Sequence, residues 1–293
     1  MQVICPKPDD FSEELINFMK KNFVGSFKKI SQTKLDKDLK FYDVVLTRFN
    51  HKINFLKNNN LRFIITPTTG VDHIDKRYFK SNTKIISLKS EYKFLKKINA
   101  SSEFTIYLML KALKTFKLYK NNFYNEISEK KIGIVGYGRN GKKIFPILEK
   151  MGAKVFINDI KKKIVPKKKY KSINQLIKSS DIISFNIPLN QSNKGIINKK
   201  KIDLFKDDTI IINTSRGEIF DEKALFNKIK KNNIFYATDV LGKYFLKNLN
   251  EKRIKKKLIY TKHVAGLTNE SVKKTDNFVL KNFLKDIKNN KKQ

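Results

Sequence analysis

The 293-residue sequence predicts an α/β protein with two doubly wound parallel sheets and a cleft between them. Short apolar runs have the composition of buried strands, and helix-period segments separate most of them. The length suits two domains. A hydrophobic content of 40%, with 23 Phe, argues against a disordered chain.

The first hundred residues alternate apolar runs with polar helical stretches. We expect strands at 43–46, 63–66 and 84–88, and helices at 12–23 and 51–58. A longer helix over 101–120 carries apolar residues on much of its surface, which is typical of a helix that is buried between domains or packed in a dimer.

The middle of the chain is more regular. We expect strands at 131–135, 154–158, 181–185, 209–213, 235–240 and 258–261, most of them separated by helical segments. This repeated βα pattern predicts a doubly wound sheet. We expect residues 100–267 to form one domain, inserted into a second domain made of residues 1–99 plus 268–293.

The net charge of +37 admits two interpretations. Clustered cations are typical of proteins that bind nucleic acids or acidic membranes. A drift toward AT-rich codons would instead raise Lys, Asn, Ile and Phe together, and here the basic residues are mostly Lys and are scattered. Because no basic run is interleaved with aromatics or zinc ligands, we favour the drift and expect no specific nucleic-acid partner.

The single cysteine, Cys5, cannot form a disulfide within the chain, which fits a reducing compartment. No apolar run reaches the roughly 18 to 20 residues that span a bilayer. The first residues lack the basic-then-apolar order of a signal peptide. We therefore expect a cytoplasmic protein with no membrane partner and no metal site.

The strongest local signal is the stretch KIGIVGYGRNGKKIF. In it, Gly136, Gly138 and Gly141 form G-x-G-x-x-G between a strand and a helix, the arrangement that binds a dinucleotide pyrophosphate in Rossmann domains. Asp159 lies 21 residues after Gly138, where an acid binds the ribose hydroxyls and disfavours a 2′-phosphate. The sequence predicts NAD, although Lys161–Lys163 leave room for NADP.

Polar residues follow three further strands. Arg216 lies where the strand at 209–213 opens into a loop, and its guanidinium suits a carboxylate, although a surface salt bridge explains it equally well. Asp239 closes an apolar strand, where an unpaired acid is costly to bury. His263 follows the strand at 258–261, either as a proton-transfer residue or as a polar residue at a strand end.

Taken in order, GYGRNG, SDIISFNIPLN, TSRGEIFDEKAL, ATDVL and TKHVAGLTNES resemble the D-isomer-specific 2-hydroxyacid dehydrogenases, which include phosphoglycerate, lactate and glyoxylate/hydroxypyruvate members. TPTTGVDHID at 66–75 is similar to the substrate loop of that family, and SSEFTIYLMLKAL to its interdomain and dimer helix. The resemblance covers nearly the whole chain. It implies two Rossmann-like domains, of which 100–267 would bind NAD as cofactor and 1–99 plus 268–293 would bind a small 2-oxo or 2-hydroxy acid as substrate. It also implies a homodimer.

The resemblance also implies roles for individual residues. Arg216 would bind the carboxylate and keto oxygen of the substrate, and His263 would donate the proton. Asp239 would hold the nicotinamide carboxamide, beside Thr214 and Ser215. The other expected cofactor contacts are Tyr137, Arg139, Asn140 and Pro188.

Substrate binding is expected in the first hundred residues as well. The resemblance implies that backbone N–H groups near Thr69, Gly70 and Val71 bind the substrate carboxylate. Arg48 follows a predicted strand, where it either reaches a second substrate anion or forms an exposed salt bridge.

The sequence departs from the family in one respect. Family members carry a Glu shortly after the position of Asp239, paired with the catalytic His, but here Tyr244 and Phe245 occupy that region. Glu251 is the nearest acid. Without a carboxylate neighbour, His263 should be less basic than its counterparts.

We therefore predict an NAD-dependent oxidoreductase that interconverts a 2-oxo acid and a D-2-hydroxy acid. The alternative is a catalytically weakened NAD(H)-sensing protein on the same fold.

Overall fold

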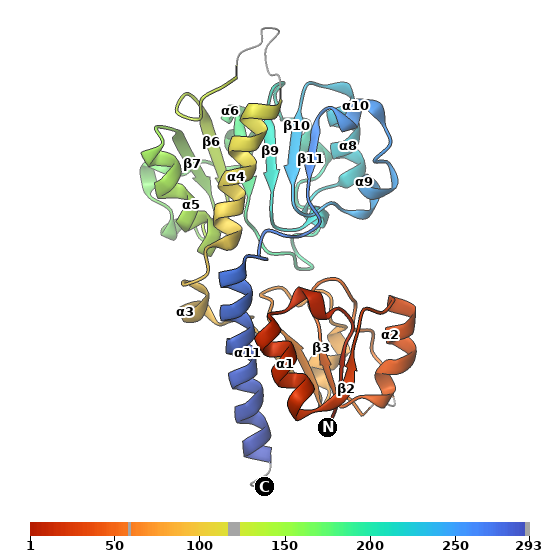
Figure 1. Ribbon diagram of the computed structural model, residues 1–293. Coiled ribbons are helices and arrows are strands. Elements are labelled where there is room, and N and C mark those ends of the chain that lie inside the picture. Colours follow the sequence, from red (N-terminus) through yellow and green to blue (C-terminus); the bar gives the residue numbers. More distant parts are fainter. Residues whose placement is uncertain (58–59, 117–123, 291–293) are drawn as a thin grey trace. The chain divides into compact units, whose positions relative to one another are not determined.

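The computed structural model describes residues 1–57, 60–116 and 124–290 (Figure 1). The chain divides into two compact units, Met1–Lys97 with Leu267–Gln293, and Ile98–Gly266. We call them unit 1 and unit 2. Within the described residues, no helix combines the length and the apolar composition needed to cross a membrane.

Unit 1 contains a five-stranded parallel sheet in the order β2-β1-β3-β4-β5. Its strands are β1 (Gln2–Cys5), β2 (Val24–Phe27), β3 (Val44–Leu46), β4 (Phe63–Thr66) and β5 (Lys84–Ser87), and its helices are α1 (Glu13–Asn22), α2 (Gln32–Asp38), α3 (Tyr92–Leu95) and α11 (Asn269–Asn290).

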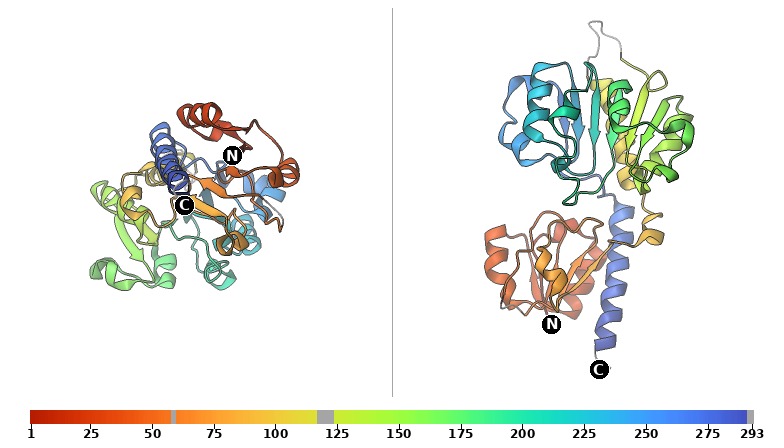
Figure 2. Two further views of the ribbon diagram at one scale, coloured as in Figure 1. Left: turned by 90° about the horizontal axis from the view of Figure 1, so that it is seen from below. Right: turned by 180° about the vertical axis from the view of Figure 1, so that it is seen from behind.

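The helices of unit 1 bury both faces of this sheet. Residues of α1 and α11, such as Met19 and Phe283, pack into one apolar cluster with β1, β3, β4 and β5. Leu35 of α2 and Tyr78 belong to a second cluster. Helix α11 packs beside β4 and β5, and it is the long blue helix in the right-hand view of Figure 2.

Unit 2 contains a six-stranded parallel sheet in the order β11-β10-β9-β8-β6-β7. Its strands are β6 (Lys131–Val135), β7 (Lys154–Asn158), β8 (Ile182–Phe185), β9 (Ile210–Asn213), β10 (Phe235–Thr238) and β11 (Leu258–Tyr260), and its helices are α4 (Ala100–Thr115), α5 (Arg139–Lys150), α6 (Ile173–Ser179), α7 (Lys199–Ile202), α8 (Glu222–Lys231), α9 (Lys243–Lys247) and α10 (Lys252–Lys255).

Helices also cover both faces of the sheet in unit 2. Leu108 of α4 and Ile144 of α5 pack in one apolar cluster, while Leu176 of α6 and Leu225 of α8 pack in another. The strands are therefore buried on two sides, which explains why they read as continuous apolar runs.

The two predicted parallel sheets are confirmed, with three local differences. Two strands of unit 1, β1 and β2, were not among those predicted. The helix predicted at 51–58 is wrong for residues 51–57, which form no helix; instead Ile53 pairs with Ile74 in an isolated parallel bridge. The helix predicted over 101–120 is α4, which ends at Thr115. Positions 58 and 117–120 of these two predicted helices lie outside the described residues.

Candidate active site

The glycine turn lies at the point where the strand order of unit 2 reverses. β6 has β7 on one side and β8 on the other, and ligands of such sheets bind beyond the strand ends at that point. Gly136 follows β6 with a φ of +93°, which only glycine adopts readily. An added Cβ at Gly141 would overlap the carbonyl oxygen of Gly136, whereas one at Gly138 would meet no protein atom within 4 Å.

These surroundings fit a dinucleotide. Gly138 is exposed and immediately precedes α5, whose first residues are Arg139 and Asn140. The N–H groups at the start of such a helix attract a phosphate. The open space above Gly138 lets a pyrophosphate approach the backbone closely.

Asp159 faces the same turn. Its Oδ2 accepts a hydrogen bond from the N–H of Tyr137 at 2.7 Å, and its Oδ1 accepts one from the N–H of Lys161 at 2.7 Å. The next residue, Ile160, is 92% exposed. An acid beside an exposed apolar side chain suits a ribose followed by an adenine ring.

A Gly138→Ala substitution is expected to weaken NADH binding without unfolding the protein. The φ of Gly138 is −79° and the Cβ meets no protein atom, so alanine is tolerated by the protein itself. Its methyl group would crowd the pyrophosphate at a cost of about 1–3 kcal/mol, or about 5- to 150-fold in Kd. Calorimetric titration with NADH measures this change. Gly141→Ala should instead lower the thermal midpoint, and an unchanged Kd for Gly138→Ala would contradict the assignment.

Asn213, which the sequence analysis missed, shapes the loop that carries Arg216. Its buried amide accepts from the N–H and hydroxyl of Ser215, at 3.0 and 2.8 Å, and donates to the carbonyl of Arg216 at 2.9 Å. The hydroxyl of Thr214 lies 2.8 Å from that of Thr105 on α4. The only signal in the sequence was a polar residue ending a run of isoleucines.

Asp239 holds the turn that carries His263. Its carboxylate is 1% exposed and accepts from the hydroxyl of Thr261 and from the N–H groups of Val264 and Ala265, the latter two at 2.8 Å. Its carbonyl oxygen accepts from the N–H of His263 at 2.9 Å. His263 has a φ of +57°, an uncommon conformation that these hydrogen bonds stabilise. The nicotinamide contact implied for Asp239 stays a prediction.

Asp239→Asn is expected to lower turnover more than it weakens NADH binding. All three donors point at the carboxylate, so an amide would turn its own NH₂ toward at least one of them and leave a buried donor unpaired, at about 1–3 kcal/mol. Measuring kcat and the NADH Kd together separates this role from a nicotinamide contact. A weakened Kd with unchanged kcat would favour the nicotinamide role.

The fold brings Arg216, Asp239 and His263 to one edge of the sheet. They follow β9, β10 and β11, which are neighbouring parallel strands. The N–H of Asp239 also donates to the carbonyl of Asn213 at 3.1 Å, which links the two loops. Pro188 follows β8 at the same edge, and its carbonyl accepts from the side chain of Asn193.

The loop of unit 1 that the sequence analysis predicts to bind substrate follows β4. Thr69 is exposed, while Gly70 and Val71 are half-buried. Three polar residues close to them in sequence, Thr66, Thr68 and His73, are buried, and the Thr68 hydroxyl donates to the carbonyl of Gly70 at 2.7 Å.

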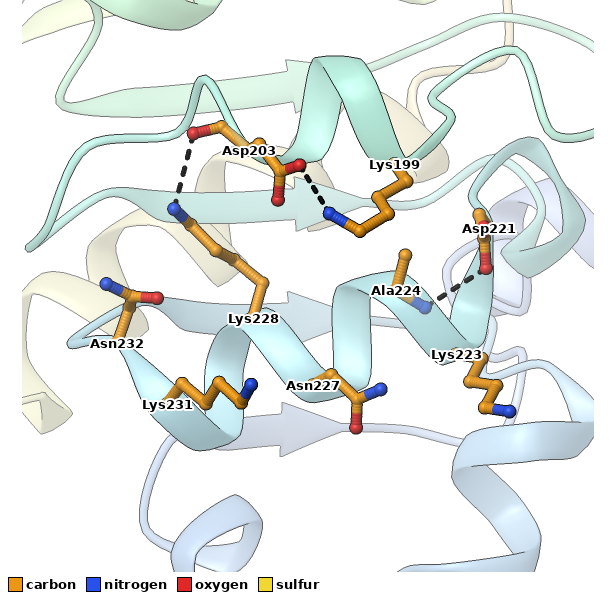
Figure 3. A pocket seen from close by; sticks show the side chains of 9 residues that line it. All are labelled: Lys199, Asp203, Asp221, Lys223, Ala224, Asn227, Lys228, Lys231 and Asn232. Carbon is orange, nitrogen blue, oxygen red and sulfur yellow. Dashed lines mark hydrogen bonds and ion pairs between the residues drawn. The ribbon is translucent and has the colours of Figure 1, made fainter.

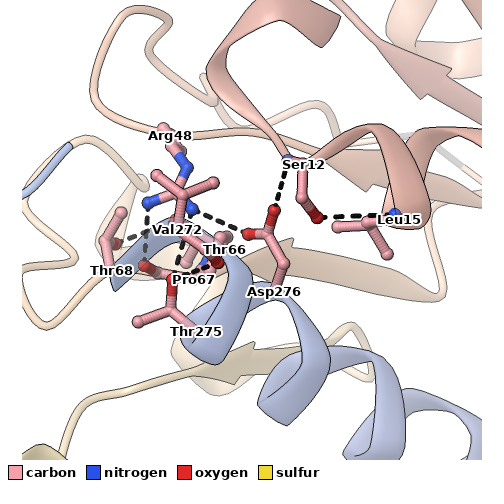
Figure 4. Close-up of polar contacts among 9 residues, drawn as sticks. All are labelled: Ser12, Leu15, Arg48, Thr66, Pro67, Thr68, Val272, Thr275 and Asp276. Atoms are coloured by element: carbon pink, nitrogen blue, oxygen red, sulfur yellow. Dashed lines mark hydrogen bonds and ion pairs between the residues drawn. The ribbon is translucent and has the colours of Figure 1, made fainter. Parts of the chain in front are cut away.

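The prediction that Arg48 forms an exposed salt bridge is wrong. Its side chain is buried, and Nη2 donates to Asp276 at 2.7 Å and to Thr275 at 3.3 Å (Figure 4). Nη1 donates to the carbonyl of Pro67 at 3.2 Å. Substrate binding by Arg48 stays a prediction that has to compete with this internal ion pair.

Glu251 and Tyr244 have partners of their own. Glu251 binds Lys230 at 2.9 Å, and this hydrogen bond lowers the pKa of the carboxyl group. Tyr244 donates its N–H to Glu222 at 3.0 Å, and its ring packs on Phe226. Glu251, the nearest acid in the sequence, is therefore paired with Lys230.

A hollow of about 390 Å³ lies elsewhere on unit 2, between α7 and α8 (Figure 3). Figure 3 shows Lys199 and Lys228 both bonded to Asp203 within it. None of the predicted site residues lines this hollow. The candidate active site therefore lies at the strand ends and not in this hollow.

Comparison with known proteins identifies the same region. Residues 104–265 match the family model described as D-isomer specific 2-hydroxyacid dehydrogenase, NAD binding domain. NAD is accordingly the cofactor of unit 2.

Individual proteins are similar over most of the chain. An erythronate-4-phosphate dehydrogenase of Wigglesworthia glossinidia brevipalpis is 33% identical, with coverage of 82% of this chain and 64% of the relative. Glyoxylate reductase 1 of Saccharomyces cerevisiae is 26% identical, with coverage of 80% and 72%. The chain spans 57 to 64% of the length of the first three erythronate-4-phosphate dehydrogenases that it matches.

Solved structures share the fold. The D-lactate dehydrogenase of Aquifex aeolicus, complexed with NAD and lactic acid, matches with a TM-score of 0.77 and 21% identity, over 99% of this chain and 96% of that one. Because the family model covers more than half of the sequence, the chain belongs to the D-isomer specific 2-hydroxyacid dehydrogenases.

Proposed function

We propose that this protein is an NAD-dependent oxidoreductase that interconverts a 2-oxo acid and a D-2-hydroxy acid. The observation that carries the proposal is the placement of Arg216 and His263 after β9 and β11, the two strands that flank β10, in the unit that also holds the glycine turn. Unit 1 would be the substrate-binding domain, and unit 2 the NAD-binding domain.

The residues divide the work of the reaction. Arg216 would bind the carboxylate and the keto oxygen, since its planar guanidinium matches a carboxylate in a bidentate manner. Its Nη1 donates to the carbonyl of Ser215 at 2.7 Å, which limits the freedom of the guanidinium. The N–H groups of Thr69, Gly70 and Val71 would also bind the substrate carboxylate.

His263 would transfer the proton. In reduction it would donate to the carbonyl oxygen as charge develops there, and in oxidation it would accept the hydroxyl proton. The cofactor supplies or accepts the hydride. Asp239 would keep His263 in place by holding the turn on both sides of it.

A substrate panel tests the proposal. The names of the curated relatives differ, from erythronate-4-phosphate dehydrogenase to glyoxylate reductase and hydroxypyruvate reductase. NADH oxidation should therefore be measured with glyoxylate, hydroxypyruvate, pyruvate and phosphohydroxypyruvate, and NAD reduction with 4-phosphoerythronate. We expect turnover with at least one. Tight NADH binding without turnover on any would favour the sensing protein instead.

A homodimer through α4 is part of the proposal. Tyr107 on α4 and Ile147 on α5 are 47% and 43% exposed, although α4 and α5 pack together and their other large apolar residues are buried or partly buried. Large exposed apolar side chains on packed helices suit a second copy of the chain. Analytical ultracentrifugation should give twice the chain mass, and Tyr107→Lys should shift the equilibrium toward monomer.

A further inference from the structure

The substrate loop directs its carbonyl groups inward and leaves three successive N–H groups unused. Within the described residues, no hydrogen bond uses the N–H of Thr69, Gly70 or Val71. The carbonyls on either side are occupied: Pro67 by Arg48, Thr68 by Leu88, Gly70 by Thr68, and Val71 by Ile74.

A chain of three buried side chains ends at the carbonyl of Gly70. Thr68 Oγ1 lies 2.7 Å from Gly70 O and 2.9 Å from Thr66 Oγ1, and Thr66 Oγ1 lies 3.2 Å from Nε2 of His73 (Figure 4 shows both threonines). The side chains of Thr66, Thr68 and His73 are at most 6% exposed.

The direction of every hydrogen bond in this series of side chains follows from the group at its end, the Gly70 carbonyl. A carbonyl oxygen only accepts, so the one proton of the Thr68 hydroxyl is used on Gly70. Thr68 must then accept from the Thr66 hydroxyl, and Thr66 must accept from His73. Nε2 of His73 therefore carries a proton, which fixes the tautomer of the neutral ring.

This series of hydrogen bonds sets the orientation of one peptide group. The peptide between Gly70 and Val71 is trans, so its carbonyl and its N–H point in opposite directions. Because the Gly70 carbonyl is drawn toward the buried Thr68 hydroxyl, the Val71 N–H is turned away from the buried threonines. That N–H is one of those expected to bind the substrate carboxylate.

We propose that Thr68, Thr66 and His73 are positioning residues that orient the Gly70–Val71 peptide for binding of the substrate carboxylate. This inference rests on the proposed function. It assigns roles to three buried polar side chains that do not themselves touch the substrate.

Thr68→Val tests the link nearest the peptide. Valine keeps the shape of threonine but removes the donor to Gly70, so KM for the 2-oxo acid should rise about tenfold or more, while the NADH Kd stays unchanged. Thr68→Ser restores the hydroxyl and should return KM to within about twofold of wild type.

Thr83→Val is the matched control. Thr83 is also buried in unit 1, and its hydroxyl donates to the carbonyl of Leu61 at 2.7 Å. This bond lies at the opposite, N-terminal ends of β4 and β5. The control should lose a similar amount of stability without a change in KM.

The rise in KM should also become smaller from Thr68 to Thr66 to His73. Thr66→Val should raise KM less than Thr68→Val, and His73→Leu less still, because each is one bond further from Gly70. His73→Gln retains a side-chain N–H donor and should recover part of the loss. Equal effects at all three positions would indicate general destabilisation and overturn the proposal.

Binding of oxamate, an unreactive 2-oxo acid analogue, separates this inference from the proposed function. With NADH present, the amide signal of Val71 should shift on oxamate titration of the wild-type protein, and Thr68→Val should lose the shift. Turnover by wild type with an unchanged KM for Thr68→Val overturns only the positioning chain. A Val71 shift without any turnover overturns only the reaction. A wild-type protein in which oxamate leaves Val71 unshifted overturns the positioning chain.

Discussion

Replacing His263 by asparagine is expected to lower kcat for 2-oxo acid reduction by about 10²- to 10⁴-fold, the usual contribution of general acid–base catalysis. Asparagine is chosen because His263 has a φ of +57°. Asparagine tolerates this conformation, whereas alanine is strained there. The substitution therefore removes the titratable proton donor and spares the turn. Steady-state NADH oxidation measures the loss.

Two controls make the result specific. The NADH Kd should stay unchanged, because the glycine turn follows β6 and His263 follows β11. Lys262→Ala, at the exposed neighbouring position, should keep wild-type kcat. If His263→Asn also kept wild-type kcat, the proton donor would have to be another residue.

Buried strands were the part of the fold that the sequence predicted best. Runs such as FIIT and TIIIN are apolar because helices cover both faces of each sheet, so their composition directly reflects their position. Two strands were missed. β1 is buried, but its apolar run within QVIC is only three residues long. The residues VGSF of β2 are exposed or half-buried at the edge of the sheet. The segment 51–57 was taken for a helix, but long-range contacts decide its shape: the N–H of Ile53 donates to the carbonyl of His73, and the His51 ring contacts the carbonyl of Ile30.

For the candidate site, the sequence predicted the positions of residues but not all of their partners. Motif spacing placed Arg216, Asp239 and His263 after successive strands, and parallel pairing then brings strand ends together without further information. The partners of other buried polar residues could not be predicted where they come from distant parts of the chain. Arg48 and Asp276 are 228 residues apart, and no local pattern marks such a pair.

Removal of Asp276 is expected to give the largest loss of stability in unit 1. Asp276 is fully buried and accepts from Arg48 and from the N–H of Ser12, both at 2.7 Å. Burial raises the pKa of Asp276 and lowers that of Arg48, so each charge is costly on its own. Asp276→Leu would leave the Arg48 cation buried without its counter-ion and lower the free energy of unfolding by about 3–5 kcal/mol.

A double substitution shows whether the unpaired charge or the lost packing dominates the loss of stability. If the loss comes from an uncompensated charge, adding Arg48→Met to Asp276→Leu should restore most of the stability that the single substitution loses. An apolar pair has no desolvation penalty. Glu14→Gln is the control. Lys273 and Glu14 also join α11 to α1, at 2.6 Å, but both are more than half exposed, so the unfolding midpoint should hardly change.

Urea unfolding of unit 1, followed by hydrogen exchange of amides in β3 and β4, reports this stability separately from that of unit 2. A single Asp276→Leu protein as stable as wild type would mean that Arg48 finds another anion or water. A double variant no better than the single one would mean that shape, through Thr275 and the Phe11 ring 5.2 Å from the guanidinium, matters more than charge. We expect neither, because the cost of an isolated buried cation exceeds the packing that methionine would lose.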